Sequence, residues 1–133
     1  MNRILVGYAG GEAGERALQL AADFAHAFGA HVDVVSVVPD GYGRAGAPSG
    51  RSAIDHARQL IDAKVILGDR GVIARLIEPE GDPATTIERL VDERGYDTVI
   101  VGASRQVAAG VPWNDTVPAH VAGHARATVI VAS

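Results

Sequence analysis

The chain has 133 residues, of which 47% are apolar and 21% are charged, a composition typical of a globular domain with one core. The formal net charge is −4, with acidic and basic residues interspersed, so the sequence lacks the basic face that nucleic-acid binding requires. The absence of cysteine excludes disulfides, thiolate metal sites and cysteine nucleophiles. We expect a single domain over residues 1–133.

No apolar run approaches the roughly 20 residues that a membrane-spanning helix needs. Met1, Asn2 and Arg3 lead directly into an apolar segment, which leaves no room for a signal peptide. These features predict a cytoplasmic protein, bacterial or archaeal, that makes no contact with membranes.

The first third of the chain predicts a strand, a helix and a second strand. Residues 4–8 form a short apolar run typical of a buried strand, and Gly10-Gly11 separates it from a long helical pattern that Gly29 should end. Residues 31–38 are rich in valine and predict another buried strand, ended by Pro39. The apolar positions of the helix, at steps of three or four, are Ala17, Ala21, Phe24 and Phe28.

The middle of the chain begins with a segment dense in glycine and proline, residues 39–50, which predicts a surface loop. A second helix is expected from about Ser52, with Ile54, Ala57 and Ile61 on one face. Residues 72–77 predict a third strand.

A clear helix start follows at Gly81-Asp82-Pro83, because Asp82 can serve as the N-cap and Pro83 suits the first helical position. This helix should end at Gly95, and residues 98–102 predict a fourth buried strand. We then expect a loop over residues 103–115, a short helix near 116–125 and a last strand over 128–131. The inward positions of the third helix are Ile87, Leu90 and Val91.

This alternation predicts an α/β fold, an open parallel sheet with helices on both faces. In such sheets ligands bind at the carboxyl ends of the strands, near the point where the strand order reverses. Those ends are residues 8–10, 37–38 and 102–103, and any small-molecule site should lie there.

Several short motifs occur in an order and spacing that resemble the universal stress protein family over the whole chain. After the Ile4-Leu5-Val6 strand, they are Glu15-Arg16-Ala17-Leu18, Glu80-Gly81-Asp82-Pro83-Ala84, Tyr96-Asp97-Thr98-Val99-Ile100-Val101-Gly102 and Ala127-Thr128-Val129-Ile130-Val131. The resemblance implies a Rossmann-like fold of the adenine nucleotide alpha hydrolase type, with five parallel strands in the order 3-2-1-4-5. It also implies a homodimer formed through the last strand, residues Thr128, Val129, Ile130 and Val131.

Members of this family that bind ATP carry a Gly, two residues, a second Gly, nine residues, and then Gly followed by Ser or Thr. An ungapped alignment places Gly102 and Thr116 at the two ends of this motif, but Arg105 and Asp115 at the second and third glycines. The family's acidic residue after the first strand falls on Ala9. The resemblance therefore implies a degenerate nucleotide site made of Ala9, Val37, Gly102, Ala103, Arg105, Asp115, Thr116 and Val117.

The charges of Asp115 and Arg105 act in opposite directions on a bound nucleotide. A carboxylate repels a triphosphate about 4 Å away by roughly 1–4 kcal/mol, whereas a guanidinium attracts it. Two alternatives stay open: Arg105 and Asp115 pair and fill the anion site, or both point to solvent. Thr116 is interpreted first as a helix cap, with anion binding as a second role. Trp113 is interpreted as a packing anchor of the loop.

His120 and His124 are four residues apart, a spacing that places both on one face of a regular helix. A zinc site needs at least one more protein ligand, and none is evident nearby, so we interpret them as surface histidines and expect no metal.

Three functional hypotheses follow. The first is a non-catalytic regulatory domain of the stress response that does not bind ATP in the family's usual manner, needs no cofactor, and acts as a homodimer and through contacts with a regulatory protein partner. The second is a sensor that still holds ATP, AMP or another nucleotide in a remodelled loop. The third is a weak hydrolase of ATP, for which the sequence supplies no base or nucleophile.

Overall fold

The computed structural model describes residues 1–37, 50–102 and 126–132, with residues 50–56 as backbone only. Five parallel strands form one sheet in the order β3-β2-β1-β4-β5, which confirms the predicted fold class and strand order. The strands are β1 (Arg3–Gly7), β2 (His31–Val35), β3 (Arg75–Ile77), β4 (Thr98–Gly102) and β5 (Thr128–Ala132). The helices are α1 (Gly11–Phe28), α2 (Gly50–Asp69) and α3 (Pro83–Arg94).

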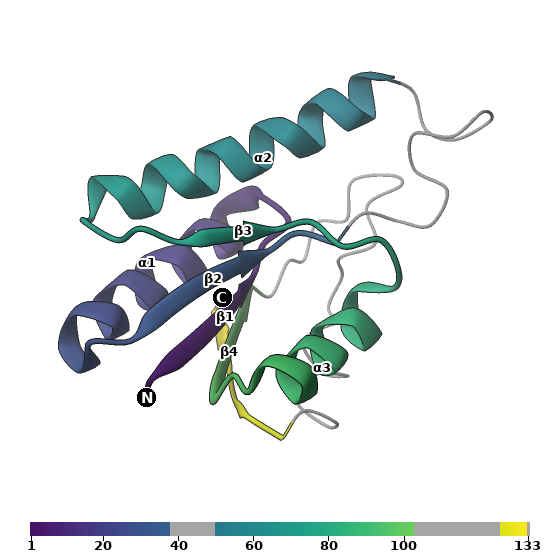
Figure 1. Ribbon diagram of the computed structural model, residues 1–133. Helices are drawn as coiled ribbons and strands as arrows, with labels where there is room; N and C mark the ends of the chain where they lie inside the picture. The colour runs from purple at the N-terminus through teal and green to yellow at the C-terminus, as the bar shows by residue number, and fades with distance from the viewer. Residues whose placement is uncertain (38–49, 103–125, 133) are drawn as a thin grey trace.

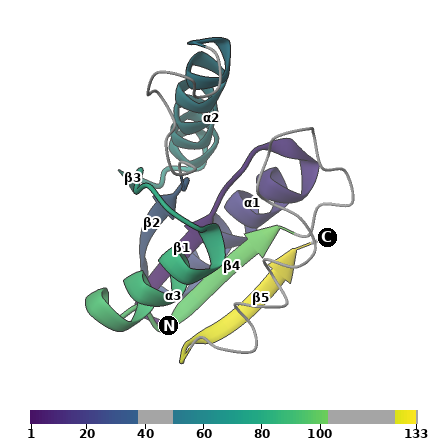
Figure 2. The same ribbon diagram turned by 90° about the vertical axis from the view of Figure 1, so that its right-hand side faces the viewer.

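The helices lie on both faces of the sheet, as predicted: α1 and α2 cover one face and α3 the other (Figures 1 and 2). Successive strand residues alternate between these faces, so Ile4 and Val6 pack under α1 while Leu5 packs under α3. Because both faces are covered, the central strands are continuously apolar rather than alternating apolar and polar.

Helix α1 ends, and helix α3 begins and ends, at the capping residues that the sequence predicted. Gly29 adopts the left-handed conformation (φ +67°) after α1, and Gly95 does the same (φ +68°) after α3. The Asp82 side chain accepts a hydrogen bond of 3.0 Å from the backbone N–H of Thr85, and Pro83 is the first helical residue. The inward positions expected for α3 are buried. These predictions are confirmed.

The apolar face that the sequence indicates for the second helix is not the face that packs on the protein. The side chains of α2 that pack on the sheet and on α1 are Leu60, Ala63 and Leu67, whereas Ala57 and Ile61 are exposed. Ile61 leaves 61% of its surface open. The helix carries apolar residues on two sides, and periodicity alone could not decide which side would face the sheet.

Two strand boundaries also differ from the prediction. Within the expected strand at 72–77, only Arg75–Ile77 pairs with β2, because the preceding residues still bond to the end of α2. The backbone N–H of Val72 donates to the Leu67 carbonyl at 2.9 Å, and Gly71 takes a positive φ of +77° in this turn. Strand β2 ends at Val35, after which Ser36 and Val37 remain buried, and the Ser36 N–H still donates to the Ile77 carbonyl of β3 at 2.9 Å.

The apolar positions that recur along α1 are not all buried. Ala17 and Ala21 are fully buried and Phe24 packs partly against the core, whereas Phe28 is exposed. The ring centroids of Phe24 and Phe28 are 6.3 Å apart. Of the loop expected at 39–50, residues 39–49 lie outside the described residues and Gly50 is already the first residue of α2. The elements expected at 103–125 also lie outside the described residues. Of the helices that are described, none combines the length and the apolar character needed to cross a membrane.

Candidate functional site

The strand order reverses at β1, which pairs with β2 on one side and with β4 on the other. A ligand of an open parallel sheet binds at the carboxyl ends of the strands on either side of such a point. The arrowheads of β2 and β3 in Figure 1 and those of β4 and β5 in Figure 2 point to this end of the sheet, which we call the ligand edge. The described residues that reach it are Tyr8, Ala9, Gly10, Gly11, Val37 and Gly102.

The turn from β1 into α1 is built on two glycines. Gly10 and Gly11 have φ of +80° and +77°, a region that other residues rarely adopt, and Gly10 occupies the N-cap position without a side chain to cap the helix. The sequence identified this pair only as a boundary. Its structural consequence is a sharp turn that presents the first backbone N–H groups of α1 at the ligand edge.

Gly102, the glycine at the start of the family motif, is in close contact with the beginning of α1. A Cβ atom at this position would lie 2.7 Å from the carbonyl carbon of Ala13 and 2.8 Å from the backbone nitrogen of Gly14. No side chain fits there without movement of the helix. Gly102 is therefore required by the packing of α1 on β4, whether or not a ligand is bound.

Ala9 and Val37 both belong to the α3 side of the sheet. Val37 is 3% exposed within the α3-side core, and Ala9 is partly buried against the same cluster. The end of β1 therefore offers only a methyl group at Ala9, the position on which the resemblance places the acidic residue of ATP-binding members. The Val37 side chain is buried in the core and is not open to a ligand.

The charges around the first turn of α1 are mostly negative. Burial raises the pKa of Tyr8, and the negative charges of Glu15 and Asp62 raise it further, so both carboxylates act on the Tyr8 hydroxyl. Glu12 lies in the first turn of α1, and Arg16 is 4.0 Å away from it at the i+4 position.

Ala103, Arg105, Asp115, Thr116 and Val117 lie outside the described residues. So do Trp113, His120 and His124. The pairing of Arg105 with Asp115 therefore stays a prediction. Over the ranges that the structure does describe, no three His, Asp or Glu side chains gather in a way that could hold a metal ion.

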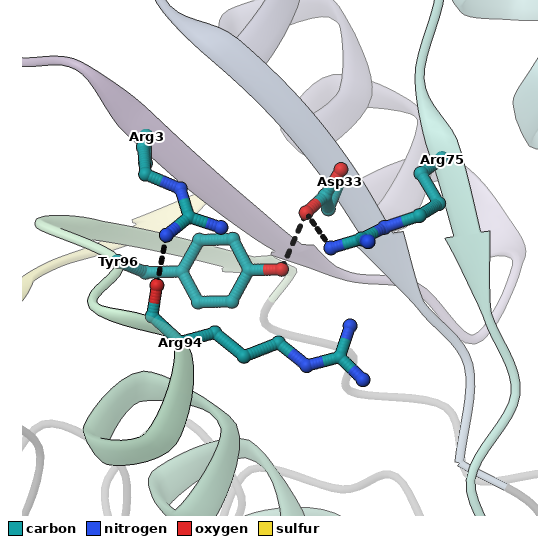
Figure 3. A network of polar contacts seen from close by, with 5 residues as sticks. All are labelled: Arg3, Asp33, Arg75, Arg94 and Tyr96. Atoms are coloured by element: carbon teal, nitrogen blue, oxygen red, sulfur yellow. Dashed lines mark hydrogen bonds and ion pairs between the residues drawn. The ribbon is translucent and has the colours of Figure 1, made fainter.

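A second polar cluster lies on the α3 side of the sheet, away from the ligand edge, and sequence reasoning missed it (Figure 3). The Tyr96 hydroxyl donates to Asp33 Oδ2 at 2.5 Å, and Arg75 Nη2 approaches the same oxygen at 2.9 Å. The Arg3 guanidinium lies over the Tyr96 ring, 4.9 Å from its centroid, and donates to the Arg94 carbonyl. The only signal in the sequence was the single acidic residue inside the valine-rich strand.

This cluster has a structural role. It joins β1, β2, β3 and the turn between α3 and β4 through one carboxylate and one aromatic ring. Burial is the main cause of the raised pKa of the Tyr96 hydroxyl, and its hydrogen bond to Asp33 raises the pKa further. The phenol therefore stays protonated and acts as the donor.

The open sheet with order 3-2-1-4-5 and a glycine turn at its switch point defines a doubly wound α/β domain. The family model of the universal stress protein family matches residues 1–133, so the chain belongs to the universal stress protein family. Comparison with curated proteins finds no significant match.

Solved structures of the same family share the fold. A universal stress protein of Archaeoglobus fulgidus in complex with dAMP has a TM-score of 0.78 at 23% identity, over 100% of this chain and 98% of that one. One from Burkholderia pseudomallei has a TM-score of 0.73 at 25% identity, over 98% and 94%. One from Arabidopsis thaliana with AMP bound has a TM-score of 0.66 at 15% identity, over 99% and 91%.

Proposed function

We propose that this chain is a non-catalytic, cytoplasmic stress-response domain that does not bind ATP in the family's usual manner and acts as a dimer through protein contacts. The observation that carries the proposal is the end of β1. There Ala9 supplies no carboxylate for a nucleoside, and Glu12 adds a negative charge to the first turn of α1.

Electrostatics disfavours a triphosphate at this edge. A single carboxylate about 4 Å from a phosphate charge costs roughly 1–4 kcal/mol, depending on the effective dielectric. The predicted position of Asp115 would add a further negative charge, whereas Arg105 would offset one. The summed electrostatic energy is unfavourable for a ligand with the charge of ATP and less unfavourable for a monophosphate.

Two measurements test this proposal. The purified protein is denatured and the supernatant is analysed for released nucleotide, and the melting temperature is then measured with ATP and magnesium. A ligand at 100 times its dissociation constant stabilises the fold by about 2.7 kcal/mol, which gives a clear shift. We expect neither release nor shift. Co-purified ATP, or a saturable shift with ATP, would contradict the proposal.

A gain-of-function variant shows whether the altered positions are responsible. We expect Ala9→Asp combined with Arg105→Gly and Asp115→Gly to restore ATP binding, because it returns the nucleoside carboxylate and both motif glycines. Ala9→Asn with the same two glycines is the matched control, since it has the same size without the charge. ATP binding by the unaltered chain equal to that of the triple variant would refute this account.

A second candidate function is a sensor for adenine monophosphates. The specific observation in its favour is that structures similar to this chain hold dAMP and AMP. Here the backbone of Val37 would contact the base, and Gly102 would allow close approach at the end of β4. Saturable binding of AMP in the absence of ATP binding would favour this function over the first.

The proposed dimer forms through β5, which lies at one edge of the sheet. An exposed edge strand carries unpaired backbone groups and is normally paired or covered. Val131 is 45% exposed, and a shallow hollow of about 420 Å³ separates α1 from this strand. The hollow is lined by Arg16, Gln19, Leu20, Asp23, Val131 and Ala132.

Light scattering tests the dimer. Val131→Lys, alone and with Val129→Lys, places charge on the edge and should give a monomer. Thr85→Lys, at an exposed position of α3, is the control and should leave the mass unchanged. Val129 also packs partly against the α3-side core, so the single variant is the cleaner test. A dimer that persists in Val131→Lys would place the interface elsewhere.

A further inference from the structure

Helix α2 carries two apolar stripes, and only one of them packs against the protein. The buried stripe is Leu60, Ala63 and Leu67. The other stripe consists of Ala57, Ile61, Val65 and Gly68, and it is centred roughly 120° around the helix from the first, at about 100° per residue. We refer to this second set as the outer stripe of α2.

The outer stripe is open to solvent. Ile61 is 61% and Val65 54% exposed, and Ala57 and Gly68 are also exposed. Figures 1 and 2 show α2 at the periphery of the molecule, and among the described elements its main neighbour is α1 on the inner side. Two large β-branched side chains, one helical turn apart and both open, are typical of an interaction surface.

The order of residues in the outer stripe is self-complementary in the antiparallel direction. When two copies of α2 run antiparallel about a two-fold axis near residue 63, Ile61 of one copy faces Val65 of the other. In the same register Ala57 faces Gly68 of the second copy. Two large residues meet at the centre and two small ones at each end, which allows the helix axes to approach closely.

One pair of flanking charges favours the same register. Arg58 and Asp69 are eleven residues apart, close to three helical turns, so both lie on one flank of the outer stripe. The antiparallel arrangement places Arg58 of one copy beside Asp69 of the other, and the two-fold axis repeats this contact. Both side chains are exposed, and neither forms an ion pair with another residue of the described ranges.

We propose that the outer stripe of α2 binds the same stripe of a second copy of this chain as an antiparallel helix pair. Four residues per copy bury less surface than the roughly 800 Å² per partner of a standard interface. The association is therefore weak and depends on the protein concentration. Because α2 and β5 lie on different sides of the molecule, this contact would link dimers formed through β5 into larger assemblies (Figure 2).

Engineered cysteines test the contact directly, because the chain has none of its own. Ala57→Cys and Gly68→Cys are both exposed, and the space around Gly68 is open. Under mild oxidation at high protein concentration, a mixture of the two variants should form a disulfide-linked dimer, whereas each variant alone should stay unlinked. A mixture of Arg89→Cys and Glu93→Cys, exposed on α3, measures random collision.

Charge exchange then tests the register. Arg58→Asp in the Ala57→Cys chain should lower the yield about two- to fivefold, and so should Asp69→Arg in the Gly68→Cys chain. Combining both exchanges should restore the yield. The proposal is overturned if the mixture links no better than the α3 control. It is also overturned if each cysteine variant links to itself as readily as to the other, or if the combined exchange does not recover.

Discussion

Gly102 and Gly68 show how differently two glycines of one chain act. At Gly102 a Cβ would lie 2.7 Å from the backbone of Ala13, and the close contact holds α1 against the end of β4. At Gly68 the surrounding space is open and the backbone is helical, so the glycine adds only flexibility to α2. The sequence marked Gly102 as part of a ligand motif, and the structure assigns it a packing role as well.

The same substitution at the two glycines should therefore have opposite effects on stability. We expect Gly102→Ala to lower the free energy of unfolding by about 1–3 kcal/mol, because the helix must move to admit the methyl group. Gly68→Ala should raise it by about 0.5–1 kcal/mol through helix propensity. Urea denaturation measures both. Equal effects at the two positions would contradict the packing role of Gly102.

Asp97 joins the amino ends of β1 and β4. Its carboxylate accepts hydrogen bonds from the backbone N–H groups of Asn2 (2.7 Å) and Arg3 (3.2 Å) and from the Thr98 hydroxyl (2.9 Å). Burial acts to raise the pKa of Asp97, but these hydrogen bonds outweigh it and hold the pKa below the ordinary value of 3.8. The folded state therefore favours the ionised carboxylate.

This lowered pKa gives Asp97 a defined pH dependence. A group whose pKa falls on folding stabilises the protein fully above its unfolded pKa, and that stabilisation is lost as the pH falls through the folded pKa. We expect Asp97→Asn to be less stable than the parent at about pH 7, and the difference to shrink below about pH 4. Urea unfolding across this range is the measurement. A difference that stays constant with pH would show that the charge is not involved.

At the scale of elements, β3 is the least supported part of the sheet. It has only three residues, lies at an edge, and pairs with β2 alone. The Asp33 carboxylate compensates by binding both Arg75 of β3 and the Tyr96 hydroxyl (Figure 3). Because the oxygen is shared, removing the tyrosine hydroxyl should loosen the arginine contact too.

We therefore expect Tyr96→Phe to speed amide hydrogen exchange in β3 more than in β4, since the ring stays but the hydrogen bond is lost. Its matched control is Tyr8→Phe, which changes a buried tyrosine on the other face of the sheet. If β3 and β4 respond equally to Tyr96→Phe, the cluster does not hold the edge strand.

Sequence patterns were most informative where one local rule decides the structure. The caps at Asp82, Gly29 and Gly95 are set by residues within a turn of each helix end, and all three were predictable. The orientation of α2 was not, because Ile61 and Leu60 belong to equally apolar stripes and the choice depends on the whole sheet. The Asp33 cluster joins residues 3, 33, 75 and 96, and no local pattern connects them.

At the scale of the whole molecule, the alternation of elements and the spacing of short motifs were sufficient to predict the fold and the family. The ligand edge was predictable too, because parallel strands place their carboxyl ends together. The negative charges that act on Tyr8 were not, since Glu15 and Asp62 come near it only through the packing of α1 and α2. A nucleotide site of altered charge at this end of the sheet stays a prediction.

The most direct test of this account is a titration of isotopically labelled protein with ATP and magnesium, followed by the backbone amide resonances of Gly10, Val37 and Gly102. These three amides lie at the carboxyl ends of β1, β2 and β4, where a bound nucleotide must change their environment. We predict no saturable change up to about 1 mM ATP. Saturable shifts of these amides at micromolar ATP would contradict the account.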